Sequence, residues 1–196
     1  MPKNRLEAFS DGIFAFAATL LILNLAVDQT KALAPQLLDN WPSYIAYAIS
    51  FITIGIIGAN HHNVMHQIAR TDRTFGMLTV LFLMFIAFIP FPTRLLALDI
   101  KGPDAEAAAL AYGITLFGTA LFFNALWWYA AFGRRLLRAD ADQRAVDGIS
   151  RSYLLGPISY GVATLVALRS PIASALLYAA IAFFYLLDST VFGRRT

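Results

Sequence analysis

The sequence contains no cysteine and few charged residues. Without cysteine among its 196 residues, the chain forms no disulfide, no cysteine-ligated metal site and no thiol nucleophile. Only 14% of the residues are charged and 59% are apolar, whereas a soluble domain has about 25% charged and roughly 45–50% apolar residues. A soluble domain of this length cannot bury so much apolar surface in one core. The composition therefore predicts an integral membrane protein.

The apolar residues fall into six blocks, each close to the roughly 20 residues that a helix needs to cross about 30 Å of hydrocarbon. Each block is expected to be helical, because a helix satisfies its own backbone polar groups in lipid. The predicted fold is all-α: one membrane domain over residues 1–196, a bundle of six transmembrane helices. The expected spans are approximately 9–27, 43–65, 75–97, 107–132, 152–169 and 172–190.

Lysine and arginine are distributed unevenly over the segments between the blocks. With a cytoplasmic N-terminus, most of the 15 basic residues lie on the inner side, as the positive-inside rule requires. They are Lys3, Arg5, Arg70, Arg73, Arg134, Arg135, Arg138, Arg144, Arg151, Arg194 and Arg195. This distribution predicts that both termini are cytoplasmic. It also accounts for the net charge of +3 without a nucleic-acid partner.

A dense polar group opens the first block: Arg5, Glu7, Ser10 and Asp11. Ser10 or Asp11 can cap the helix, and acidic residues favour its positive N-terminal end. However, an ionised Asp11 inside the membrane costs about 2.5–3.5 kcal/mol or more unless it is paired. A partner for Asp11 is therefore expected.

All three histidines lie near the inner end of the second block, at His61, His62 and His66. The four-residue spacing of His62 and His66 can place two metal ligands on one helix face. Three histidines in one stretch are nevertheless too few for a di-iron site. Hydrogen bonding from His61 or His62 to the Asp11 group is the favoured role, and neither a metal site nor a bound cofactor is predicted.

The rest of the first block is apolar. Phe16, Leu20, Leu23 and Val27 recur at helical spacing and form one face, with Thr19 at its border. Taken alone, such a face points toward lipid, and Thr19 bonds to its own helix backbone. The sequence shows no Gly-rich phosphate loop, serine triad or paired-carboxylate site, so we do not expect an enzyme.

Three motifs in this order resemble the transmembrane protein 175 family, the potassium channels of lysosomes and bacteria. They are Arg5-x-x-x-Phe9-Ser10-Asp11, Asn60-His61-His62 and Phe91-Pro92-Thr93. The resemblance covers the whole chain, although the last three spans match only in pattern. It implies a potassium-preferring cation channel in the cell (inner or plasma) membrane of a bacterium. The channel would be a homotetramer whose pore is lined by the first helix of each subunit.

The resemblance also implies roles for individual residues. The pore constriction would be Phe16, followed outward by Leu20 and Leu23. Thr19 would tune potassium preference, and Asp28 in the outer vestibule would replace an acid that the family often carries at the position of Asn24. The network that positions the pore helix would comprise Arg5, Ser10, Asp11, His61 and His62. Phe16 is itself a departure, because the first ring in the family is usually Ile or Leu.

Rings of apolar side chains gate a pore by dewetting. Because such a pore has no ring of carbonyls, we expect potassium and other monovalent cations to permeate with only a modest preference for potassium over sodium. A second interpretation is a small secondary transporter or proton-conducting protein that uses Asp11 and the histidines as a relay. Transporters usually show internal repeats and broken helices, and neither is clear in this sequence.

Overall fold

The computed structural model describes residues 2–141 and 143–192. All regular elements in these residues are helices, apart from one isolated bridge between Ile68 and Leu137. The elements are α1 (Lys3–Leu20), η1 (Leu21–Asn24), α2 (Leu33–Asp39), α3 (Trp41–Gln67), α4 (Arg73–Phe88), α5 (Pro90–Asp99), α6 (Ala105–Ala131), η2 (Phe132–Arg134), α7 (Gln143–Ala167) and α8 (Pro171–Phe192). The predicted all-α class is confirmed.

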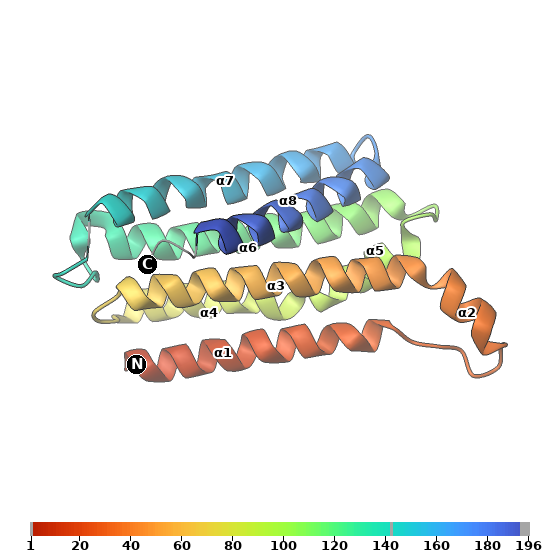
Figure 1. Cartoon of the computed structure of the whole chain (residues 1–196), viewed down its shortest axis with the longest axis horizontal. Helices are drawn as coiled ribbons and strands as arrows, with labels where there is room; N and C mark the ends of the chain where they lie inside the picture. Colours follow the sequence, from red (N-terminus) through yellow and green to blue (C-terminus); the bar gives the residue numbers. More distant parts are fainter. Residues whose placement is uncertain (1, 142, 193–196) are drawn as a thin grey trace.

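The long helices lie side by side along one common direction, and the short α2 lies beyond their ends (Figure 1). Helix α1 is at one edge of the bundle, and α7 is at the opposite edge (Figure 1). The main packing neighbours of α1 are α3 and α4, with a smaller contact to α5. One side of α1 is therefore covered by the chain, and the other is not.

Four helical stretches are long and apolar enough to cross a membrane: Lys3–Asn24, Trp41–Gln67, Arg73–Asp99 and Ala105–Arg134. In α8 the apolar stretch Pro171–Leu187 is shorter. Helix α7 begins at Gln143, well before the predicted span, and includes Arg151. Hydropathy indicates which part of a helix lies in hydrocarbon, but it does not indicate where the helix begins or ends. The predicted span therefore starts later than α7 does. That α7 and α8 also cross the membrane stays a prediction.

Proline interrupts two of the helices. Helix α4 ends at Phe88 and α5 begins at Pro90, because Pro90 and Pro92 have no backbone N–H to continue the helix ladder. In α7, Pro157 likewise cannot donate to the carbonyl of Tyr153, four residues earlier. The side-chain amide of Asn124 in α6 donates to that carbonyl at 2.9 Å. This contact ties α7 to α6 where the helix ladder is incomplete.

The centre of the bundle is aromatic. Phe82 of α4 is fully buried, with ring centroids of Phe14, His61 and Phe123 between 5.5 and 6.0 Å away. These four rings come from α4, α1, α3 and α6. The cluster fixes how α1 is seated against the rest of the chain.

Candidate pore-lining helix

The covered face of α1 is made of residues spaced four, four, three and four apart. They are Leu6, Ser10, Phe14, Ala17 and Leu21, none more than 8% exposed. This spacing keeps side chains on one side of a helix. Residues of α1 that lie between these buried positions in the sequence point away from the rest of the chain.

Phe14 holds α1 in its rotational position. A Cβ at Gly58 of α3 would lie 3.3 Å from Phe14 Cδ1, so the absence of a side chain at Gly58 lets the phenyl ring approach α3 closely. The Phe14 ring also lies 5.7 Å from the His61 ring, centroid to centroid. A rotation of α1 would require this ring to leave its site.

The opposite face carries the residues expected at the constriction. Phe16 is 61% exposed and Leu23 is 67% exposed, whereas Leu20 is half-buried at the edge of the face. Phe9, seven residues before Phe16, is also exposed. Large apolar side chains are thus aligned on a side of α1 that no other helix of this chain covers.

Thr19 lies on the same exposed side. Its hydroxyl donates to the carbonyl of Phe16 at 2.9 Å, the bond to its own helix that the sequence favours. Because the proton is used inside the helix, the lone pairs of Thr19 Oγ1 are free to accept a hydrogen bond or to coordinate a cation. Thr19 therefore presents an oxygen ligand about one turn beyond Phe16.

Ser10 and His61, two members of the expected positioning network, are buried but do not bond to each other. Ser10 Oγ donates to the Leu6 carbonyl at 2.9 Å. The His61 ring stacks on Phe82, with 16° between the ring planes. Its Nε2 is buried and has no hydrogen-bond partner in the described residues. Both residues seat α1 against the core through packing.

Arg5, Asp11 and His62 are exposed. Within the described residues of a single chain, no hydrogen bond or ion pair joins them. Asp11 lies at a groove of about 290 Å³ between α1 and α3, beside Gly55 and Ala59. A partner for Asp11 therefore stays a prediction for the assembled protein.

The η1 segment that continues α1 is tied to the start of α5. The Asn24 amide donates to the Pro90 carbonyl at 3.1 Å. Sequence reasoning treated Asn24 only as the place of a missing acid and did not anticipate this bond. No local pattern signals this bond, because Pro90 is the first residue of α5 and the two partners lie 66 positions apart.

Asp28 lies in the loop that follows η1 and is exposed. Its carboxylate accepts from the Thr30 hydroxyl at 2.6 Å and from the Thr30 N–H at 3.0 Å. It also lies 3.4 Å from Lys31 Nζ. The Thr30 bonds lead the interactions that lower the pKa of Asp28 below its ordinary value. Asp28 is therefore ionised at neutral pH in the loop that follows η1.

Metal ligands are not gathered in this region. Within the part of the chain that the structure describes, no group of three or more His, Asp or Glu side chains is placed to hold a metal ion. Any cation on the exposed face of α1 would meet apolar side chains and the Thr19 hydroxyl.

Comparison with known proteins identifies relatives of this chain. Residues 5–90 match the model of the family "Endosomal/lysosomal potassium channel TMEM175". A potassium channel of Chamaesiphon minutus is 44% identical over 164 residues, which cover 81% of each chain. A potassium channel of Streptomyces collinus is 37% identical over 187 residues, covering 93% of this chain and 91% of that one.

The fold has a similar solved counterpart. The crystal structure of a homolog of the lysosomal potassium-selective channel TMEM175 from Chamaesiphon minutus superposes with a TM-score of 0.87 at 38% identity. The match covers 95% of this chain and 97% of that one. The similarity therefore extends over α1 and over the helices that seat it.

Proposed function

This chain belongs to the TMEM175 family of potassium channels, and from that premise we propose that four copies of it enclose a potassium-conducting pore lined by α1. The protein is a multi-pass membrane channel and not an enzyme. The observation that carries the proposal is the row of apolar side chains on the uncovered face of α1. One helix cannot enclose a pore, so this face needs copies of itself around an axis.

The constriction in this proposal is a ring of Phe16, with Leu20 and Leu23 following outward. A narrow apolar ring loses its water and blocks ions until it widens. Four phenyl rings around an axis need a change of rotamer or a rotation of α1 to let an ion pass. Phe14 resists rotation, so we favour movement of the Phe16 side chains.

Ion preference in this proposal comes from Thr19. Its hydroxyl oxygens replace part of the water that an ion sheds near the ring, which gives a modest preference for potassium over sodium and passage of other monovalent cations. Asp28, ionised in the outer vestibule, raises the local cation concentration.

The assembly is proposed to join subunits through exposed polar residues at the inner ends of α1 and α3. Among the described residues of one chain, no hydrogen bond or ion pair is found for Arg5, Asp11 or His62, and an exposed Asp11 at membrane depth requires a partner. We place the tetramer in the inner or plasma membrane of a bacterium with both termini in the cytoplasm, consistent with its bacterial relatives and its basic inner loops.

The proposal is tested on protein in planar bilayers between unequal potassium and sodium solutions. We expect ohmic single-channel steps, a reversal potential displaced toward the potassium equilibrium potential, and a particle mass of four chains. Saturable, coupled flux without steps would identify a transporter. A reversal potential that follows an imposed pH gradient would identify a proton pathway.

A further inference from the structure

A second feature lies away from the exposed face of α1. A cavity of about 160 Å³ is formed between α3, α6, α7 and α8, and no residue of α1 lines it. Its walls are mainly apolar, with Ile56 from α3 and Leu116 and Phe123 from α6. Its volume is that of a small molecule rather than a single water.

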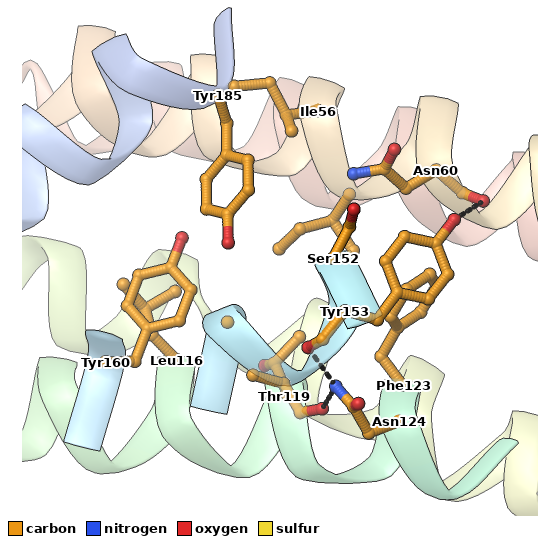
Figure 2. A pocket seen from close by; sticks show the side chains of 13 residues that line it. Ile56, Asn60, Leu116, Thr119, Phe123, Asn124, Ser152, Tyr153, Tyr160 and Tyr185 are labelled. Atoms are coloured by element: carbon orange, nitrogen blue, oxygen red, sulfur yellow. Dashed lines mark hydrogen bonds between the residues drawn. The ribbon is translucent and has the colours of Figure 1, made fainter. Parts of the chain in front are cut away.

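The polar side chains that line this cavity are uncharged. Figure 2 shows the hydroxyls of Tyr160 and Tyr185 pointing toward each other across it, with Asn60 and Ser152 on the other side. Tyr160 is only 7% exposed, and its hydroxyl has no hydrogen-bond partner among the described residues. This hydroxyl faces the cavity, so it can donate a hydrogen bond to a ligand there or accept one from it.

The dimensions and chemistry of the cavity define the ligand class. An engineered apolar cavity of about 150 Å³ holds one benzene molecule, so this cavity accommodates one six-membered ring. No Asp, Glu, Lys or Arg lines it, which excludes an ionised ligand because its charge would be buried unpaired. We propose that the cavity binds a small neutral aromatic alcohol, with its ring against Leu116 and Phe123 and its hydroxyl bonded to Tyr160.

A route of entry is present. The cavity shares Ile56, Asn60, Ser152, Tyr153 and Tyr185 with a wider cleft of about 1070 Å³ along α3, α7 and α8. In a single chain the cavity therefore borders the open space along α3, α7 and α8. Binding here is independent of the pore and does not rest on the proposed function.

The test uses 4-fluorophenol, followed by ¹⁹F NMR on the full-length protein in nanodiscs, with nanodiscs lacking protein to measure partition into lipid. We expect saturable broadening of the fluorine resonance. 4-Fluorotoluene has the same size but no hydroxyl, and its partition-corrected affinity should be about tenfold lower, because one hydrogen bond is lost. Tyr160→Phe should weaken 4-fluorophenol binding by a similar factor.

The matched variants are Gly156→Leu and Gly76→Leu. Gly156 lines the cavity, with Ala120 Cβ 3.8 Å from its would-be Cβ, so leucine enters the cavity and should abolish binding. Gly76 on α4 has open space around it and lies outside the cavity, so leucine there should leave binding unchanged. Equal binding by the two variants, or no saturable signal above empty nanodiscs, would overturn the site. Equal affinities for 4-fluorophenol and 4-fluorotoluene would show that the ligand does not need a hydroxyl.

Discussion

Phe14 and Phe16 lie two residues apart on α1 and point to opposite sides of it. Phe14 is 8% exposed and Phe16 is 61% exposed, because two residues turn a helix by about 200°. The first ring is held by Gly58 and His61, whereas no ring contact of the second is found among the described residues. The seating of Phe14 thus determines which side chains face the proposed pore.

Phe16→Ala should raise single-channel conductance severalfold and weaken discrimination among cations. The alanine removes the phenyl ring from the narrowest ring of the pore, so the passage widens and stays wet. Single-channel recording in potassium, sodium and caesium solutions measures both effects.

Ile22→Ala is the control for Phe16→Ala. Ile22 in η1 is also exposed but points to a different side of the helix from Phe16. A comparable rise in conductance for Ile22→Ala would mean that another face of α1 lines the pore. Leu21, the residue before Ile22, does not serve as a control because it is fully buried. Truncating it leaves a core cavity that costs about 2–5 kcal/mol.

Thr19→Val should lower the potassium-to-sodium permeability ratio while leaving the conductance nearly unchanged. Valine keeps the shape of threonine and removes the only oxygen that the exposed face offers near Phe16. Loss of about 0.5–1 kcal/mol of differential coordination corresponds to a two- to fivefold lower ratio. Reversal potentials under bi-ionic conditions give the ratio, and an unaltered ratio would remove Thr19 from ion selection.

Asp11→Asn should reduce the fraction of tetramer in detergent without changing the helix content of the chain. Asp11 is exposed and unpaired within one chain, so its partner is expected on another copy. Light scattering gives the mass and circular dichroism gives the helicity, and His62→Ala should act in the same direction. Normal assembly combined with altered ion selectivity would place Asp11 in the ion path instead.

Asn124→Leu should destabilise the chain by about 1–3 kcal/mol, because the Tyr153 carbonyl is left buried without a donor. The same substitution should cost clearly less in a Pro157→Ala background, where residue 157 regains the N–H that the helix ladder requires. Urea unfolding of the four proteins completes a double-mutant cycle. Additive losses would show that Asn124 does not compensate for Pro157.

Acid should destabilise the N-terminal end of α4 through Asp72. Its carboxylate accepts from the Phe75 N–H at 2.8 Å and from the Tyr129 hydroxyl at 2.7 Å, and these bonds lower the pKa of Asp72 below its ordinary value of 3.8. A lowered pKa means that the stabilisation is complete above pH 3.8 and is lost as the pH falls through the lower pKa of the folded state. Thermal unfolding is measured between pH 2 and 6, about two pH units either side of the ordinary pKa. The unfolding temperature should fall less on acidification for Asp72→Asn than for the original protein. An identical fall in melting temperature for the original protein and for Asp72→Asn would show that another group causes the acid sensitivity.

Much of the fold follows from the sequence because lipid allows few alternatives. Each apolar block had to be helical, and the break at Pro90 follows from the missing N–H. The helix ends did not follow, since α7 continues through Arg151 into the polar segment before the apolar block. Hydropathy reports where hydrocarbon begins, whereas a helix ends where its hydrogen-bond ladder does.

The candidate site was predictable on one side only. The spacing of Phe16, Leu20 and Leu23 on one face could be read directly, and the buried face is its complement. The rotational lock between Phe14 and Gly58 depends on two helices approaching closely, which no local pattern reveals. The bond from Asn24 to Pro90 joins residues 66 positions apart and is equally invisible in the sequence.

The central claim, that the uncovered face of α1 lines the pore, is tested most directly by thiol block at two adjacent residues. The chain has no cysteine, so a single introduced thiol is the only target for a positively charged methanethiosulfonate reagent. Leu23 and Ile22 are both more than half exposed but point in different directions around the helix. We expect the reagent to block potassium current through Leu23→Cys channels and to leave Ile22→Cys channels conducting. Block of Ile22→Cys with no effect on Leu23→Cys would contradict the central claim.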